Sequence, residues 1–181
     1  MNTPSTRASQ AAVIAAATIF GLTYGLGAPL ISLALSKRGL GETMIGLNAA
    51  MYALGVLAVA ALLPRLAARW GARKVIVGSL LMVAVVLPLF PLAPWLWLWF
   101  PLRFAMGLAS EGVFVMSEAW VNQLSDEKSR ARSIAIYTAS LSLGFALGPL
   151  ILSVTGSEGA LPYFIGGALA LAAMAMILRP G

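Results

Sequence analysis

Three ionisable residues, Arg103, Glu111 and Glu118, interrupt the apolar stretch from Trp95 to Asn122. This stretch is long enough to cross a membrane as a helix. At about 100° per residue, such a helix places the three side chains within roughly 80° of one another. A charge near the bilayer centre costs at least about 2.5 kcal/mol, so charged side chains there usually face a bundle interior or a hydrated cavity. We therefore interpret the stretch as a helix that lines a transport path. The small and polar residues on the same side are Gly107, Ser110 and Ser117.

Glu111, near the middle of this stretch, is the predicted site of proton coupling. Removal from water disfavours the charged form of a carboxyl group, so a buried glutamate can hold a proton. The chain has no His, so only Asp or Glu can carry a proton inside the membrane. A carboxyl that loads a proton on one side and releases it on the other is the minimum requirement for proton coupling. The alternative is that Glu111 is a protonated, hydrogen-bonded packing residue.

Arg103 has no predicted acidic partner. A helical rise of about 1.5 Å per residue separates it from Glu111 by roughly 12 Å. One interpretation is that Arg103 binds an anionic or polar group of a substrate, or steers the proton equilibrium of a nearby carboxylate. The alternative is that it extends toward the interface and hydrogen-bonds the backbone. Polar residues of the first two apolar stretches are candidates for the same substrate cavity, with packing as the alternative: Tyr24, Asn48 and Tyr52.

Composition identifies a polytopic membrane protein. The chain is 60% hydrophobic and 10% charged, with a mean hydropathy of +0.92. So few charges could not cover the surface of a soluble domain of this length. The absence of His and Cys removes most hydrolytic nucleophiles and metal sites, and no Gly-rich phosphate loop is present. We therefore expect no enzyme, no metal and no cofactor.

About 20 apolar residues span the hydrocarbon core of a bilayer. On that count the chain is all-α, with a short polar cytoplasmic tail at 1–10 and a bundle of six transmembrane helices within 11–181. The helices are expected near 11–35, 44–64, 75–93, 95–122, 133–153 and 160–178. The predicted connections are Ser36–Thr43, Arg65–Lys74, Pro91–Pro94, Leu124–Arg132 and Thr155–Gly159.

Basic residues predict the orientation, because cytoplasmic loops carry an excess of Lys and Arg. The connections at one end hold most of them: Arg7, Arg65, Arg69, Arg73, Lys74, Lys128, Arg130, Arg132 and Arg179. The other end holds Lys37 and Arg38. Both termini are therefore expected in the cytoplasm. The net charge of +6 is explained by this topology, and no nucleic-acid partner is expected.

Three motifs resemble signatures of the major facilitator superfamily. The segment Pro64–Lys74 is similar to the loop between helices 2 and 3 of that family, and the matching residues are Leu66, Ala67, Arg69, Gly71, Arg73 and Lys74. Arg103 followed four residues later by Gly107 resembles the helix 4 signature. The glycine and proline residues Gly144, Gly148 and Pro149 resemble the helix 5 signature of exporters and antiporters. The segment Ser117–Asn122, with Arg130, Arg132 and Tyr137, is similar to the YcaD-like branch of bacterial members.

The resemblance implies a secondary transporter, expected to export a small molecule in exchange for protons across the inner membrane of a bacterium. It also implies a cytoplasmic gate network, in which Glu118 could stand in for the family aspartate at Ala68. The expected members of the network are Arg69, Gly71, Arg73, Lys74, Glu118 and Arg130.

The chain corresponds to one half of a two-bundle transporter, in which substrate binds between the halves. The missing half would come from a longer gene, of which this chain is a fragment, or from a second chain such as a parallel copy of this one. The expected partners are the lipid bilayer, a small-molecule substrate, protons and a second six-helix half. The alternative function is a fragment or accessory membrane subunit that binds a partner and transports nothing.

Overall fold

The computed structural model describes residues 4–178, with side chains from residue 8 onward, and all regular secondary structure in this part of the chain is helical. Its elements are α1 (Pro4–Lys37), α2 (Glu42–Ala60), α3 (Leu63–Trp70), α4 (Ala72–Leu92), the 3-10 helix η1 (Leu96–Leu98), α5 (Trp99–Gln123), α6 (Arg130–Thr155) and α7 (Leu161–Leu178). Six of these segments are long and apolar enough to cross a membrane. The predicted fold class is confirmed.

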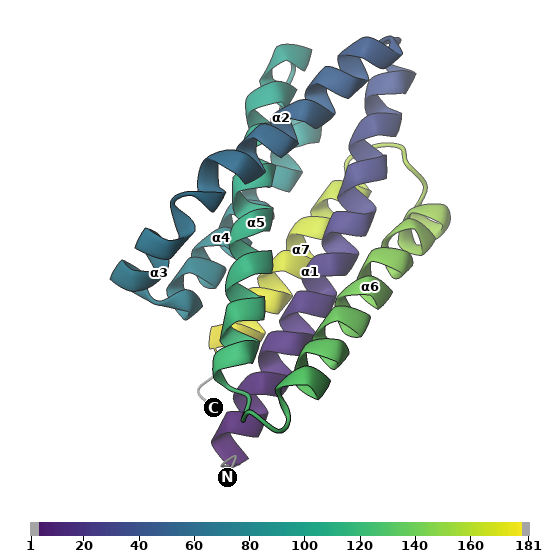
Figure 1. The fold of residues 1–181 in the computed structure, drawn as a ribbon. Helices are drawn as coiled ribbons and strands as arrows, with labels where there is room; N and C mark the ends of the chain where they lie inside the picture. Colours follow the sequence, from purple (N-terminus) through teal and green to yellow (C-terminus); the bar gives the residue numbers. More distant parts are fainter. Residues whose placement is uncertain (1–3, 179–181) are drawn as a thin grey trace.

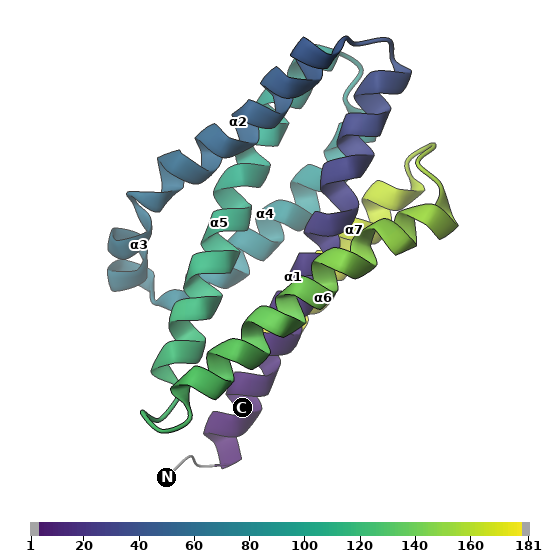
Figure 2. The same ribbon diagram turned by 45° about the vertical axis from the view of Figure 1, so that its right-hand side comes forward.

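The six long helices pack as one bundle with α1 near its centre (Figure 1). Helix α1 packs mainly against α6 and α7, and α5 packs mainly against α2 and α4. Both ends of the described chain lie at the same end of the bundle, as an even number of crossings requires (Figures 1 and 2). We call this the proximal end. The connections 38–41, 93–98 and 156–160 lie toward the opposite, distal end.

The connection between α2 and α4 differs from the prediction. Residues 65–74 were expected to form a loop, but α3 occupies Leu63–Trp70, and α2 already ends at Ala60. Pro64 lies in the first turn of α3, where its missing N–H costs nothing. The short helix buries Leu63 and exposes Arg69, so it is amphipathic rather than spanning.

Gly71 separates α3 from α4 and has a φ of +81°. Residues with a Cβ rarely adopt this conformation, so glycine permits the sharp turn at this position.

Other helix ends also differ from the expected ones. Helix α1 already begins at Pro4, so most of the segment 1–10 continues the first helix. Helix α4 includes Pro91 and ends at Leu92, which shortens the expected turn at Pro91–Pro94. Helix α6 begins at Arg130 within the predicted connection Leu124–Arg132.

Glycines bring α1 and α6 into backbone contact. A Cβ at Gly144 would meet the carbonyl oxygen of Thr18, and a Cβ at Gly148 would meet the backbone of Gly25 and Leu26. Small residues allow this approach, and close packing drives helix association in lipid. Pro149, next to Gly148, lies inside α6 without ending the helix. The glycine and proline motif therefore fixes the packing of α6 on α1.

Arg73 joins the start of α4 to the end of α7. Its Nε donates to the carbonyl of Ile177 at 3.1 Å, and an Nη donates to that of Leu178 at 2.9 Å. The last carbonyls of a helix lack helical partners, and a cation there also interacts favourably with the helix dipole. Arg73 therefore holds the segment at which the described chain ends.

Replacing Arg73 by glutamine is expected to loosen the end of α7. Two hydrogen bonds from a charged donor are lost, and because the site is partly exposed we expect a cost of about 1–2 kcal/mol. Hydrogen exchange of amides 172–178 should accelerate, while exchange in the middle of α5 should not. Arg65→Gln removes the same charge from the exposed face of α3 and serves as the control. Equal exchange in the two variants would contradict the capping role.

Candidate functional site

Four helices bring an aromatic and cationic cluster together in the bundle. The rings of Tyr24 in α1 and Tyr52 in α2 have centroids 5.4 Å apart, and Phe145 of α6 meets Tyr24 edge-on at 5.4 Å. The guanidinium carbon of Arg103 in α5 lies 5.3 Å from the centre of the Tyr52 ring. Three of the four residues expected to line the substrate cavity, Tyr24, Tyr52 and Arg103, are thus close together.

Gly107 sets the separation of α2 and α5 at this cluster. A Cβ at Gly107 would lie 2.9 Å from the carbonyl carbon of Tyr52, which is closer than side chains approach a backbone. Gly55 has the reciprocal role, because a Cβ there would meet the carbonyl oxygen of Phe104. The spacing of four residues between Arg103 and Gly107 therefore places two contacts with Tyr52 on one face of α5. Gly107 lets the backbone of Tyr52 approach closely, and Arg103, one helical turn away, lies over the Tyr52 ring.

Arg103 is buried without a counter-charge. Only 6% of its surface is exposed, and its Nε has no hydrogen-bond partner among the described residues. Among residues 8–178, no carboxylate lies within ion-pair distance of it. A cation over an aromatic face gains about 0.5–2 kcal/mol, which offsets only part of the cost of leaving water. In the described structure the Nε of Arg103 is therefore a strong donor without an acceptor.

Asn48 has a different place from the one expected. It is 2% exposed, and its Nδ2 donates to the carbonyl of Trp99 at 3.1 Å. Its amide therefore ties α2 to the first turn of α5. Although Asn48 lies one turn from Tyr52, this hydrogen bond gives it a packing contact between the two helices, the alternative considered from the sequence.

Glu111 is partly exposed, two turns of α5 away from Arg103. In the described part of the chain it forms no ion pair. Its neighbour Gly112 faces Ser79 of α4, where an added Cβ would meet the Ser79 side chain. Among the described residues, the Glu111 carboxyl therefore has no ion-pair partner.

Hydroxyl groups join α5 and α6 at the proximal end. Ser117 and Tyr137 share a hydrogen bond of 2.8 Å between buried oxygens, and the Tyr137 hydroxyl also lies 3.2 Å from the carbonyl of Phe114. Nearby, Gln10 of α1 donates to Ser125 at 2.7 Å and to Ser133 at 3.0 Å. The sequence had placed Ser117 on the polar side of the helix, but it gave no sign of the Gln10 link.

The cations expected in the cytoplasmic gate network lie at the proximal end, but they do not pair with Glu118. No ion pair joins Glu118 to Arg69, Arg73 or Arg130 among the residues that the structure describes. Arg73 binds the end of α7 instead, and the guanidinium of Arg69 lies 5.9 Å from the ring centre of Trp70. Lys74 and Arg130 are exposed in the first turns of α4 and α6.

One aromatic residue of the site was not identified from the sequence. Phe145 packs on Tyr24 and is 37% exposed. Its only signal in the sequence was its place directly after Gly144.

Comparison with known proteins shows the family. The profile of the Major Facilitator Superfamily matches residues 13–181. An uncharacterized MFS-type transporter, YfkF of Bacillus subtilis, is 30% identical over 159 residues, which are 85% of this chain and 39% of the relative. Multidrug resistance protein 1 of the same organism is 27% identical over 153 residues, 84% of this chain and 39% of the relative. The major facilitator-type transporter psiT2 of Psilocybe cubensis is 33% identical over 106 residues, 59% of this chain and 20% of the relative. The chain thus spans about two fifths of the length of the bacterial relatives.

Proposed function

Because this chain belongs to the major facilitator superfamily, we propose that it forms one half of a secondary transporter that exports a small molecule in exchange for protons. The observation that carries this proposal is the buried guanidinium of Arg103 over Tyr52, with no acceptor of its own. The name of the relative called a multidrug resistance protein supports export rather than uptake. Membership of a transporter family also argues against an enzyme.

The chemistry of the cluster indicates which substrates fit. Arg103 offers donors to a carboxylate, sulfonate or similar acceptor, and a planar guanidinium favours acceptors that can take two bonds. Tyr24 and Phe145 offer aromatic surface beside it. An aromatic molecule with an anionic group satisfies both features, and p-toluenesulfonate, which stays ionised at all relevant pH values, is a suitable probe.

The substrate would bind against a second six-helix half. Only 17% of the apolar stretch of α2 and 22% of that of α6 are buried, against 44% for α1 and for the span containing α5. The two helices that flank the aromatic cluster are thus the least covered. A second half, from a longer chain or from a parallel copy, would cover them and close the cavity over Arg103.

The membrane and branch that we propose follow from the sequence. The excess of Lys and Arg at the proximal end supports a cytoplasmic location for both termini, in the inner membrane of a bacterium. The residues Ser117, Glu118, Asn122 and Tyr137 support the YcaD-like branch.

Reconstitution separates transport from the alternative, an accessory subunit that only binds a partner. The chain is placed in vesicles that contain the pH dye pyranine, and a pH gradient is imposed. We expect added p-toluenesulfonate to accelerate the collapse of the pH gradient. The p-toluenesulfonate should cross the membrane in the direction opposite to that of the protons. Behaviour identical to that of protein-free vesicles would favour the alternative, a fragment or accessory subunit that transports nothing by itself.

Replacing Glu111 by glutamine is expected to uncouple transport from protons. The amide keeps the size and polarity of the carboxyl group but cannot release a proton. The gradient-driven flux of p-toluenesulfonate should fall at least about tenfold, while exchange of labelled for unlabelled substrate without a gradient should persist. Glu127→Gln, in the exposed connection before α6, is the control. Gradient-driven flux at the original rate would show that Glu111 carries no proton.

A further inference from the structure

A second polar site lies at the distal end of the bundle, away from the aromatic cluster. The distal pocket has a volume of about 380 Å³, within the range of small-ligand sites. It is formed by the end of α1, the end of α4, the start of α5 and the connection before α7. Its polar lining consists of Lys37, Arg38, Ser157, Glu158 and Tyr163.

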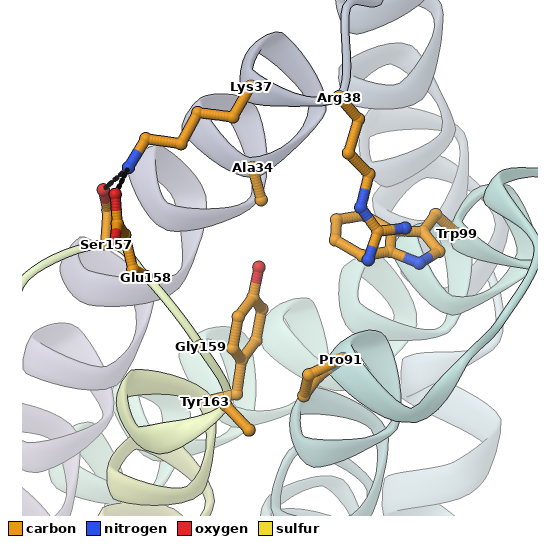
Figure 3. Close-up of a pocket in the computed structure, with 10 residues that line it drawn as sticks. Ala34, Lys37, Arg38, Pro91, Trp99, Ser157, Glu158, Gly159 and Tyr163 are labelled. Atoms are coloured by element: carbon orange, nitrogen blue, oxygen red, sulfur yellow. Dashed lines mark hydrogen bonds and ion pairs between the residues drawn. The ribbon is translucent and has the colours of Figure 1, made fainter.

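Tyr163 is the buried polar residue that points into this pocket. It is only 2% exposed, and its hydroxyl has no hydrogen-bond partner within the described part of the chain. Figure 3 shows the hydroxyl directed toward Ala34 of α1, into the space between Lys37 and Arg38. The ring is fixed on one side by Phe90 and Trp99, at centroid distances of 6.3 and 6.4 Å. A buried hydroxyl without a partner costs free energy that a bound acceptor would recover.

The two cations of the pocket differ in their pairing. Lys37 is neutralised by Glu158 at 3.1 Å and also donates to Ser157 at 3.0 Å. Arg38 lies over the ring of Trp99 at 4.6 Å and forms no ion pair with any described residue (Figure 3). This contact with the ring face uses none of the N–H donors of the guanidinium. The pocket therefore carries one uncompensated positive charge beside an unpaired hydroxyl.

The position of the pocket indicates the kind of anion. Trp95 and Trp97 lie at the same end of the bundle and are each 62% exposed. Tryptophan concentrates at the level of lipid headgroups, where phosphate is the abundant anion. The neighbouring Trp99 is instead 1% exposed, and its ring packs against the Arg38 guanidinium.

We propose that the distal pocket binds a phosphate group through the Arg38 guanidinium and the Tyr163 hydroxyl. The phosphate is that of a phospholipid headgroup or of a soluble phosphate, and both present the same acceptor oxygens. A bound phosphate would link α1 to α7 across the pocket. The proposal does not depend on transport.

Thermal unfolding of the purified chain in a neutral maltoside detergent tests this proposal with two probes. One is inorganic phosphate, and the other is phosphatidylglycerol, compared with galactosyl diacylglycerol, which has no phosphate. At least one phosphate probe is expected to raise the unfolding midpoint in a saturable manner, and the galactolipid is not. If both probes raise the midpoint, a soluble phosphate is sufficient for binding. If phosphatidylglycerol alone raises it, the bound phosphate is that of a lipid headgroup.

Three substitutions assign the binding to the pocket. Arg38→Gln should raise the probe concentration that gives half of the midpoint shift at least about tenfold. This is the loss of affinity expected when a charged hydrogen-bond donor is removed. Tyr163→Phe should weaken the response while leaving the midpoint without ligand equal or higher, because a buried unpaired hydroxyl is removed. Glu158→Gln should strengthen it, since Lys37 is released and a negative charge is lost. Arg132→Gln, which removes a charge from the proximal end, is the matched control and should respond as the original chain does.

Three results would overturn the proposal. The first is an unfolding midpoint that neither phosphate probe changes. The second is a response that Arg38→Gln and Tyr163→Phe retain in full. The third is a response that Arg132→Gln reduces as much as Arg38→Gln does. Because the readout is ligand-dependent stability rather than flux, none of these results depends on the outcome of the vesicle experiments.

Discussion

Replacing Arg103 by lysine is expected to reduce the initial rate of p-toluenesulfonate transport at least tenfold, although the positive charge remains. The guanidinium is planar and lies 5.3 Å from the centre of the Tyr52 ring, with its Nε buried and unpaired. An ammonium group cannot offer two parallel donors to one acceptor. The loss of about 1.4 kcal/mol of substrate stabilisation gives the tenfold effect. The measurement is the rate of uptake into vesicles at several substrate concentrations.

Two variants make the Arg103 result specific. Arg132→Lys changes an exposed arginine of α6 in the same way and should leave the rate unchanged. Tyr52→Leu keeps an apolar side chain beside Arg103 but removes the ring, and it should weaken substrate binding in the same direction. An Arg103→Lys variant that transports at the original rate would exclude a role for the guanidinium fork in substrate binding.

Replacing Gly148 by leucine is expected to have the largest effect on folding. A Cβ at this position would meet the backbone of Gly25 and Leu26, and a backbone cannot move aside as a side chain can. Overpacking a core costs about 1–3 kcal/mol, and we expect a value at or above about 3 kcal/mol here. Helices α1 and α6 would have to separate, which would also move Phe145 away from Tyr24. The protein should accumulate poorly in membranes and unfold at a markedly lower temperature in detergent.

The chain offers a matched control for the glycine substitution. Gly78 lies inside α4, and a Cβ there would meet nothing within 4 Å. Gly78→Ala should therefore be neutral or stabilise the helix by up to about 1 kcal/mol. Gly148→Ala should already be destabilising, so the contrast between the two alanine variants isolates helix contact from helix propensity. Equal stability of Gly78→Ala and Gly148→Ala would contradict the packing described for α1 and α6.

The sequence alone determined the architecture. A chain with this hydropathy must place its apolar segments in a bilayer, and about 20 residues are needed for each crossing, so the six spans followed from length and composition. The motifs around Gly71, Arg103 and Gly148 could also be identified from the sequence. Each depends on a property local to the chain, namely a positive φ, a charge within an apolar stretch or a pair of small residues one helical turn apart.

Only the tertiary structure decided which polar side chains meet. Asn48 and Tyr52 look equivalent on a helical projection, yet one bonds the backbone of α5 and the other lies under Arg103. Trp99 has the same local sequence signal as Trp95 and Trp97 but is buried beneath Arg38. These differences arise from the rotation of each helix about its axis and from contacts between residues far apart in the chain. Periodicity cannot provide either, because it describes one helix at a time.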